Sequence, residues 1–328
     1  MLQPPNRRRQ LLTAGASTAL MSMLPAVSRA AGGKILMGYW PIAAGLPFYV
    51  ALEKGYFKEV GLNVEAVKFA SPSQIVEAMV AGRIHGSANG TASAALALGE
   101  ITSPNLFKII CSNPSNHKYV LDEFLVPMDS KATSIKDLKG ARIACGPGIQ
   151  NVVLTKIILE KNGLGDIKPI ELPVGQHVPA LVAGQIDAVY TLEPSGTIGR
   201  VKEQSKILET GVISKYVLDD ADAPWFGGTA SLTTSLIKES PEDVKKFLSA
   251  YAKGVDFVRK NPEASRPSLD KYTSIDSSIA KEVPIANFVM YNEFTPSDIS
   301  AFQKYFDVFT ERKIFTQKVD VKSLIYGI

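Results

Sequence analysis

Residues 78–85 have the sequence AMVAGRIH, and residues 180–187 echo it as ALVAGQID, 102 positions further along the chain. A weaker echo precedes it, because Leu-Glu-Lys occurs at residues 52–54 and again at 159–161. Convergence remains an alternative, since helices often end in Ala-Gly before an apolar strand. The shared order of helix, strand, helix and strand favours two halves of similar architecture.

Short apolar runs alternate with helical stretches on both sides of these echoes. We expect strands at residues 34–40, 62–69, 84–89, 107–111, 124–126, 141–145, 170–172, 186–191 and 230–234. We expect helices at residues 47–60, 73–81, 91–98, 150–161, 178–183, 241–259, 279–290 and 296–310. Alternation of this kind predicts an α/β fold, with a mostly parallel sheet covered by helices on both faces.

The first thirty residues have the pattern of an export signal. Arg7, Arg8 and Arg9 precede a short apolar stretch at residues 11–24, and residues 28–30 form a small-x-small cleavage site. The apolar stretch is too short to span a membrane. Residues 8–12 (RRQLL) resemble the twin-arginine export motif, with an ordinary Sec signal as the alternative. No cysteine follows the expected cut, so we do not expect a lipoprotein.

Composition excludes several classes of protein for the body of the chain. The net charge of +4 comes from the first thirty residues, which hold four arginines and no acid. A neutral body argues against nucleic-acid binding, which needs a basic excess. Two cysteines in 328 residues exclude a disulfide scaffold and a cysteine-rich zinc fold. The length allows two domains of ordinary size.

Several short motifs occur in a family-like order. Residues 48–57 (FYVALEKGYF) are followed by 61–64 (GLNV), and residues 134–140 (SIKDLKG), 183–188 (AGQIDA) and Glu193-Pro194 come later. This series resembles the nitrate/taurine/alkanesulfonate solute-binding proteins of ABC transporters. That family also includes binders of the thiamine pyrimidine. His85 departs from the pattern, because the family usually has an acidic residue there.

The resemblance implies a periplasmic binding-protein fold, with two doubly wound α/β lobes joined by two crossover strands. Residues 1–30 would be the signal, residues 31–125 and 230–328 the first lobe, and residues 126–229 the second. The chain would leave the first lobe near residues 124–127 and return near 225–234. A ligand would bind between the lobes, and hinge closure would present the closed form to a membrane permease. We therefore expect a periplasmic monomer that binds a small organic ion or aromatic compound, without a cofactor.

Ligands of parallel α/β sheets bind beyond the carboxyl ends of the strands, which selects the loops that follow them. Ser73, Thr91 and Gln150 fall there near expected helix N-termini, whose free N–H groups suit an anion, although Ser and Thr are also ordinary helix caps. No arginine or lysine lies in these loops. The candidate ligand-binding residues are Trp40, Pro41, Ser71, Ser73, Asn89, Gly90, Thr91, Gly146, Gly148, Gln150, Asn151, Glu193, Trp225 and Phe226.

Two candidates suggest what the ligand presents. Trp40 and Trp225 lie in expected loops and would supply aromatic walls, as small-molecule sites commonly do. Glu193 would favour a ligand with an amine, or else cap the turn before Pro194. Gly146 and Gly148 match part of the G-x-G-x-x-G motif of dinucleotide-binding sites, but the third glycine of that motif is absent. We therefore expect these glycines to let the backbone approach the ligand closely.

Catalysis and metal binding receive little support from the sequence. The three histidines are scattered, without the spacing of metal ligands. Cys145, at the end of an expected strand, is the one candidate nucleophile, and an enzyme on the same two-lobed fold is the alternative function. A disulfide between Cys111 and Cys145 would tie the lobes together, and we do not expect it.

Overall fold

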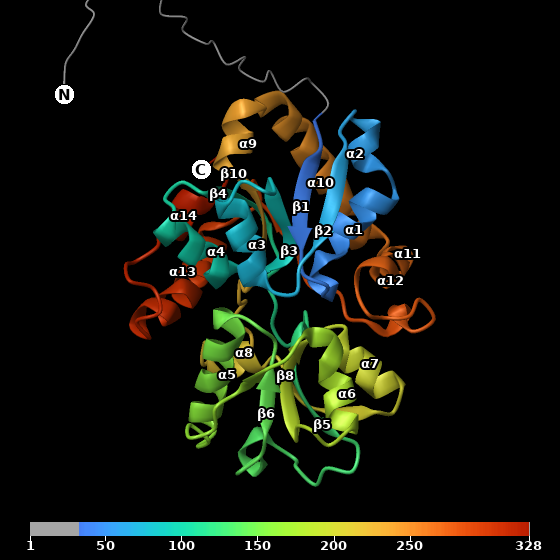
Figure 1. Ribbon diagram of the computed structural model, residues 1–328, viewed down its shortest axis with the longest axis vertical. Helices are drawn as coiled ribbons and strands as arrows, with labels where there is room; N and C mark the ends of the chain where they lie inside the picture. Colours follow the sequence, from blue (N-terminus) through green and yellow to red (C-terminus); the bar gives the residue numbers. More distant parts are fainter. Residues whose placement is uncertain (1–32, 328) are drawn as a thin grey trace, which may run out of the picture. The chain divides into compact units, whose positions relative to one another are not determined.

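The computed structural model describes residues 33–327. The expected export signal, with Arg8, Arg9 and the cleavage site at residues 28–30, lies outside the described residues. Within them, the chain forms two β-sheets with helices packed around each (Figure 1).

The first sheet has six strands in the order β11-β4-β10-β3-β1-β2. Parallel pairing joins β1 to β2 and β3, whereas β10 lies antiparallel between β3 and β4. β11 adds an antiparallel edge beside β4. The bounds are Ile35–Tyr39 (β1), Val64–Lys68 (β2), Gly86–Ala92 (β3), Phe107–Ser112 (β4), Gly228–Thr233 (β10) and Val289–Met290 (β11).

The second sheet has five strands in the order β7-β6-β8-β5-β9. Again three neighbours are parallel, and an antiparallel strand, here β5, lies between the third and the last. The bounds are Asp122–Pro127 (β5), Ile143–Cys145 (β6), Ile170–Glu171 (β7), Ala188–Leu192 (β8) and Ser205–Thr210 (β9). The strand order β2-β1-β3-β10-β4 of the first sheet therefore recurs in the second.

Helices connect the strands and cover the sheets. Those before β10 are Leu46–Glu53 (α1), Tyr56–Glu59 (α2), Pro72–Val80 (α3), Ser93–Thr102 (α4), Ile149–Lys161 (α5), His177–Val182 (α6), Ser195–Val201 (α7) and Val212–Tyr216 (α8). Those after β10 are Thr234–Glu239 (α9), Pro241–Lys260 (α10), Pro262–Ser265 (α11), Leu269–Tyr272 (α12), Pro296–Glu311 (α13) and Val321–Leu324 (α14). Short 3-10 turns occur at Ala43–Gly45, Ile135–Asp137, Val174–Gln176, Arg266–Ser268 and Ala280–Glu282.

The sequence echo corresponds to equivalent packing in the two halves. α3 packs on α4, where Gly99 leaves room for the Val76 side chain. α6 packs on α7, where a Cβ at Gly199 would lie 3.4 Å from the Val178 side chain. A larger residue at Gly99 would push α3 and α4 apart, whereas one at Gly199 would first meet the Ser205 side chain of β9. The echo therefore marks the same helix pair in both halves.

His85 accepts a backbone hydrogen bond at the position where the family usually has an acidic residue. Its Nδ1 accepts a hydrogen bond of 2.9 Å from the Leu36 backbone N–H at the start of β1. In the second half, Asp187 accepts a bond of 2.7 Å from the Arg142 backbone N–H just before β6. Because an imidazole nitrogen and a carboxylate are both acceptors, His85 makes the same kind of contact with a backbone N–H as Asp187 does.

Two segments link the sheets and hydrogen-bond to each other. Residues 113–121 lead from β4 to β5, and residues 217–227 lead back to β10. The Ser115 N–H donates to the Trp225 carbonyl at 3.1 Å, and the Trp225 N–H donates to the Ser115 carbonyl at 2.9 Å. We expected the chain to leave the first half near residues 124–127. The crossing comes earlier, because these residues belong to β5 of the second sheet.

The predicted helices at 150–161, 241–259 and 296–310 are confirmed, with bounds that differ by one residue at an end. The predicted helix at 47–60 is wrong as a single element. Gly55 has φ of +72°, a left-handed conformation that ends α1 and lets the chain start α2 in a new direction. β9 and α8 were not predicted, because their apolar residues are few and interrupted by charges.

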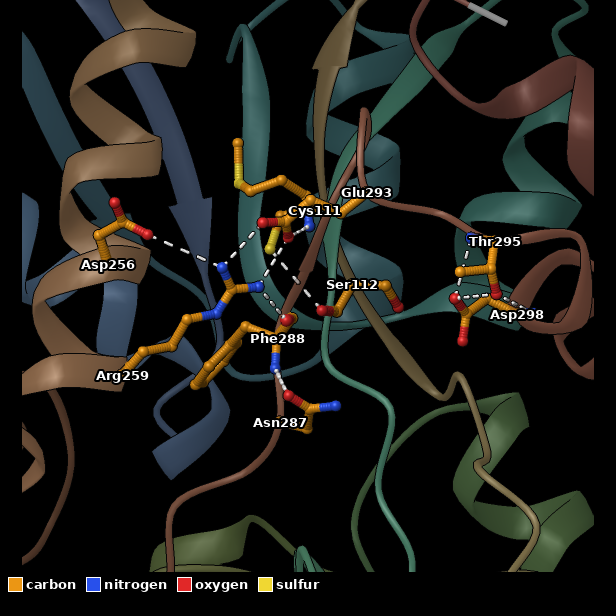
Figure 2. Close-up of polar contacts among 10 residues, drawn as sticks. Cys111, Ser112, Asp256, Arg259, Asn287, Phe288, Glu293, Thr295 and Asp298 are labelled. Carbon is orange, nitrogen blue, oxygen red and sulfur yellow. Dashed lines mark hydrogen bonds and ion pairs between the residues drawn. The ribbon is translucent and has the colours of Figure 1, made fainter.

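The predicted helix at 279–290 is also wrong. Apart from one 3-10 turn, this segment is extended, and its end forms β11 at the sheet edge. Pro284 removes a backbone donor from the middle of the segment. Arg259, at the end of α10, holds the segment in place, as Figure 2 shows: it donates to the Phe288 carbonyl at 2.6 Å and to both Glu293 carboxylate oxygens at 2.8 and 2.6 Å.

Removing the Glu293 charge should loosen β11. Arg259 lowers the pKa of Glu293, so the stabilisation is present above the ordinary glutamate pKa and is lost as the pH falls through the lowered value. Because both side chains are over a third exposed, we expect Glu293→Gln to cost only about 1 kcal/mol, or about 2 °C in Tm. Chemical denaturation at pH 7 measures this.

Glu242→Gln is the matched control, because Glu242 pairs with Lys245 on an exposed helix surface and holds no other segment. An equal loss of stability in the two variants would show that Arg259 and Glu293 do not anchor β11.

His177 links two elements of the second half from a buried position. Its Nδ1 lies 2.7 Å from the Thr191 hydroxyl oxygen in β8, and its Nε2 lies 2.9 Å from the Leu172 carbonyl oxygen after β7. Burial lowers the pKa of His177 to about 4, because the charged imidazolium would lose its hydration. His177 is therefore uncharged in the folded protein at neutral pH.

Acid should destabilise the protein through this histidine. The pKa of His177 is lower in the folded protein than in the unfolded chain, where it is about 6.5. The contribution of His177 to the free energy of unfolding is therefore fully present above pH 6.5 and is lost as the pH falls toward 4. The stability difference between the wild type and His177→Gln should shrink over that range by about 3 kcal/mol. Urea titrations of both proteins at several pH values measure it. A pH-independent difference would contradict the assignment.

Candidate ligand-binding site

The loops after β1, β2 and β7 meet between the two sheets and enclose a cavity of about 460 Å³. Such a volume suits a small organic molecule. The first sheet and its loops contribute Trp40, Pro41, Lys68, Phe69 and Ala70, the second half contributes Pro173, Val174 and Gly175, and the loop after α12 contributes Ser274.

The cavity wall is mainly apolar, with one charge. Trp40 and Phe69 supply aromatic surface, and Lys68 is the only charged residue of the lining. The Lys68 ammonium group makes no hydrogen bond or ion pair with any residue between 33 and 327. An unpaired ammonium group beside an apolar wall suits a ligand with an anionic head and an apolar or aromatic body.

Trp40 lies against the second half of the molecule. A Cβ built at Gly146 would be 3.3 Å from the Trp40 ring and 3.2 Å from the Asn151 amide nitrogen. The Tyr49 hydroxyl donates to the Trp40 carbonyl at 3.2 Å and fixes the loop that carries the ring. The structure therefore brings together Trp40, Gly146 and Asn151, three predicted residues from both halves. Because Gly146 lacks a side chain, the indole can approach the backbone closely.

Gln150 ties the two halves directly. Its side-chain Oε1 accepts a hydrogen bond of 2.9 Å from the Ala94 N–H in the first turn of α4, and its Nε2 donates one of 2.9 Å to the Gly227 carbonyl. The same carbonyl accepts from the Ser93 N–H at 3.0 Å. The buried side chain of Gln150 thus accepts a hydrogen bond from a free N–H group at the N-terminus of α4, and this N–H is not available to a ligand.

The predicted helix start at Thr91 is wrong, because β3 continues to Ala92. Gly90 to Ala92 are small enough to pair closely with β10, where Gly228 lies opposite Ala92. The Thr91 hydroxyl donates to the Ala88 carbonyl at 2.9 Å instead of capping a helix. Gly90, with φ of +85°, donates its N–H to the Asn113 side chain at 3.1 Å.

Asn89 is engaged within the first half and does not line the cavity. Its side-chain oxygen accepts from the Tyr251 hydroxyl at 2.6 Å, and its amide donates to Asn113 at 3.4 Å. Both polar ends of this side chain therefore already have protein partners.

Ser71, rather than Ser73, caps α3. The Ser71 hydroxyl accepts from the Gln74 N–H at 3.4 Å. Ser73 lies one turn inside, where its hydroxyl would be 3.4 Å from a Cβ at Gly148 in the second half. Ser73 and Gly148 therefore face each other across the junction, beside Gln150 and Asn151.

The Glu193 carboxylate caps its own helix. It accepts bonds from the Thr197 N–H at 3.2 Å and the Thr197 hydroxyl at 3.1 Å, at the start of α7. Burial raises the pKa of Glu193 to about 7, and burial together with the Glu193 charge raises the pKa of the neighbouring Glu123. Glu193 does not line the cavity, but its carbonyl accepts a bond of 2.9 Å from the Ala43 N–H of the first half.

Trp225 and Phe226 pack under the C-terminal helix α13 instead of lining this cavity. The Trp225 indole N–H donates to the Asp122 carboxylate at 3.0 Å, and its ring lies 6.0 Å from that of Tyr305. Phe226 stacks on Phe302 at 5.0 Å. We expected Trp225 and Phe226 to line the ligand site, but helix α13 covers both side chains.

Sequence reasoning missed Lys68, Phe69, Pro173, Val174 and Ser274 among the lining residues. Lys68 and Phe69 directly end the apolar run of β2, so the strand-end rule could have selected them. Ser274 carries no such signal, because only the packing of α12 on α1 brings it to the cavity.

Cys145 does not have the surroundings of a nucleophile. It is fully buried in β6, and burial raises the pKa of its thiol to about 12. A reactive cysteine needs a lowered pKa and access to its substrate. Cys111 is likewise buried, and both cysteines are free thiols.

Two further searches cover residues 33–327 only. In this range no group of three or more His, Cys, Asp or Glu side chains is arranged to hold a metal ion. No helix in the same range is long and apolar enough to cross a membrane.

Solved structures share this fold. The alkanesulfonate-binding protein SsuA from Xanthomonas axonopodis pv. citri, bound to MOPS, aligns with a TM-score of 0.71 at 19% identity over 90% of this chain and 99% of that one. The periplasmic nitrate-binding protein NrtA from Synechocystis PCC 6803 aligns with a TM-score of 0.69 at 15% identity, over 89% and 85% of the two chains. The chain therefore has the periplasmic binding-protein fold.

Sequence comparison agrees with this fold. A protein of Bacillus subtilis (strain 168) assigned as an aliphatic sulfonates-binding protein is 26% identical over 85% of this chain and 82% of its own. The formylaminopyrimidine-binding protein of Halalkalibacterium halodurans is 28% identical over 70% and 67%. The model of the family described as NMT1/THI5 like matches residues 44–265, about two thirds of the chain. The protein belongs to the NMT1/THI5-like family.

Proposed function

We propose that this protein is the substrate-binding component of an ABC importer, which captures a small organic anion between its two halves and delivers it to a membrane permease. The observation that carries the proposal is the cavity between the two sheets, whose wall is built from strand-end loops of both halves. A site shared in this way is complete only when the halves are together, so ligand binding and closure are coupled.

The moving bodies in this proposal are two lobes, each with one sheet and its helices. The sequence predicts their boundaries at residues 125/126 and 229/230, and we move these boundaries to the crossing segments at 113–121 and 217–227, so that β5 and β10 each stay whole. The paired crossing segments at Ser115 and Trp225 supply the hinge, because few other backbone bonds join the sheets. Hinges of binding proteins commonly consist of a few such linking residues.

The cavity chemistry favours an aliphatic sulfonate among the ligands named for the relatives. Lys68 offers a cation for the sulfonate oxygens, and Trp40 and Phe69 offer apolar surface for the attached chain. An aminopyrimidine is the second candidate, because the indole of Trp40 can stack on a flat ring. The capped position of Glu193 makes it a poor partner for the ring amine.

We infer a binding role without catalysis. The relatives are described as binding proteins, and Cys145, the one candidate nucleophile, is buried with a raised pKa. The proposal also places the mature protein in the periplasm as a monomer, exported by the signal in residues 1–30 through the twin-arginine or the Sec route.

Titration calorimetry with ethanesulfonate, nitrate and 4-amino-5-hydroxymethyl-2-methylpyrimidine tests the ligand class. We expect ethanesulfonate to bind, and Lys68→Met to weaken its binding up to about fivefold, because an exposed ion pair contributes at most about 1 kcal/mol. Lys108→Met is the control, since Lys108 lies in the same sheet but bonds the Ser323 carbonyl. Tight binding of the pyrimidine alone would assign the second candidate, and no binding of any probe would contradict the proposed function.

The two tryptophans, the only ones in the chain, should respond differently. Trp40→Phe leaves only Trp225, so the change in intrinsic fluorescence on adding ligand should disappear. Trp40→Ala should weaken binding by about 1–3 kcal/mol, a 5- to 150-fold effect, because it removes one wall of the cavity.

Trp225→Phe should keep ligand affinity within about threefold but lower stability by about 1–3 kcal/mol, because the Asp122 carboxylate loses a buried donor. Calorimetry and thermal melting separate the two effects. A Trp225→Phe protein with normal stability and lost affinity would move the site to the crossing segment.

A further inference from the structure

A second cavity adjoins the ligand cavity. It has a volume of about 290 Å³ and lies against the neighbouring helices α6 and α7, with Val178 and Ile198 in its wall. Three lining residues, Val174, Gly175 and Ser274, belong to both cavities. Because these residues form a common wall, a ligand that is too long for the first cavity has room to extend into the second.

Gly175 leaves the boundary between the two cavities open. A Cβ built at this glycine would meet no atom within 4 Å, and its φ lies outside the left-handed region. Every other glycine from Gly38 to Gly327 either has a neighbour close to such a Cβ or has a positive φ. Neither packing nor backbone conformation therefore requires a glycine at position 175. The consequence of the missing side chain is free space on the wall that the cavities share.

Each cavity has one cation and no acid in its lining. Lys202 is the only charged residue that lines the second cavity, as Lys68 is in the first. The Lys202 ammonium group makes no hydrogen bond or ion pair with any residue between 33 and 327. Hydrogen bonds from Ser278 and, more weakly, the Lys202 charge lower the pKa of Asp276, but Asp276 lines neither cavity. An anionic group of a ligand would therefore meet no carboxylate in the lining of either cavity.

Two hydroxyl groups of the second cavity also lack protein partners. Ser195 is only 3% exposed, and its hydroxyl makes no hydrogen bond with any residue between 33 and 327. Buried polar side chains usually have such a partner, so this one is an exception. In the same part of the chain the hydroxyl of Ser274, on the shared wall, also has none. Hydroxyl and ammonium groups both donate hydrogen bonds to anions.

We propose that the two cavities are the two ends of one elongated site for an organic dianion, a chain with an anionic group at each end. One anionic group pairs with Lys68, and the other pairs with Lys202 and accepts a hydrogen bond from Ser195. The chain between them passes Gly175 on the shared wall. The proposal rests on the proposed function and narrows its ligand class from organic anions to dianions.

Titration calorimetry with two series of ligands tests the elongated site. Alkane disulfonates with a sulfonate at each end and two, four or six carbons are compared with the monosulfonates of the same length. We expect the four- or six-carbon disulfonate to bind about two- to fivefold more tightly than its monosulfonate, because it adds one exposed ion pair. The two-carbon disulfonate should show no such gain if it is too short to reach both lysines.

Lys202→Met should bring the ratio of disulfonate to monosulfonate affinity down to about one, because the second ion pair is lost. Lys168→Met is the matched control and should keep the wild-type ratio. Lys168 is an exposed lysine of the same half that lines neither cavity.

Gly175→Leu should close the boundary between the cavities. We expect it to weaken binding of hexane-1,6-disulfonate at least about fivefold, because the leucine side chain enters the space that the ligand needs. Its melting temperature should match the wild type, since a Cβ at this position meets no neighbour. Gln176→Leu is the control, because Gln176 is exposed in the same turn and lines neither cavity.

The outcomes separate this proposal from the proposed function. Disulfonates that bind no more tightly than monosulfonates at all three lengths would overturn the elongated site, while binding of ethanesulfonate would still support transport of an organic anion. A ratio above one that persists in Lys202→Met would also overturn the elongated site. Binding of none of the probes would contradict both proposals.

Discussion

The two crossing segments, residues 113–121 and 217–227, hydrogen-bond to each other and so determine how the two sheets meet. Each crossing segment leads into an antiparallel strand that lies beside the third parallel strand of its sheet. This strand is β10 in the first sheet and β5 in the second. The first half is therefore not a continuous piece of chain, because β10 and β11 join its sheet only after residues 122–210 have formed the whole of the second sheet. The two-way bond between Ser115 and Trp225 fixes where the halves meet, and the strand-end loops then face each other across that point.

Contacts of several kinds cross the junction. The Gln150 side chain bonds to α4 and to the return crossing, the Ala43 N–H bonds to the Glu193 carbonyl, and Trp40 packs beside Gly146. Arg200 and Arg312 add ion pairs with Glu282 and Glu160. Each of the hydrogen bonds contributes a net free energy of about 1 kcal/mol, because water replaces a bond that breaks.

The sequence was sufficient to predict the elements with strong periodicity. Prolines at the starts of α10 and α13 and the amphipathic pattern behind them made both helices predictable, and the echo at residues 78 and 180 revealed the repeated architecture. The segment at 279–290 failed because its apolar spacing fits a helix, whereas its position is set by Arg259, an interaction between distant residues. Thr91 failed because small residues carry no signal for where a strand ends.

For the candidate site, the strand-end rule selected loops of both halves, and the structure brings Trp40, Gly146 and Asn151 from these loops together. It could not say which side chains face the cavity. Asn89 and Glu193 are polar residues with partners of their own, and Trp225 is covered by α13 from the far end of the sequence. Lys68 was overlooked because it was counted as the end of a strand. Local patterns identify loops, whereas orientation and cover come from long-range packing.

The two buried thiols have a consequence for where the chain can fold. Cys111 and Cys145 lie in different sheets, neither is oxidised, and no covalent bond crosses the junction. The native state is therefore independent of the redox potential of its surroundings. Folding of the chain therefore requires neither an oxidant nor a disulfide isomerase.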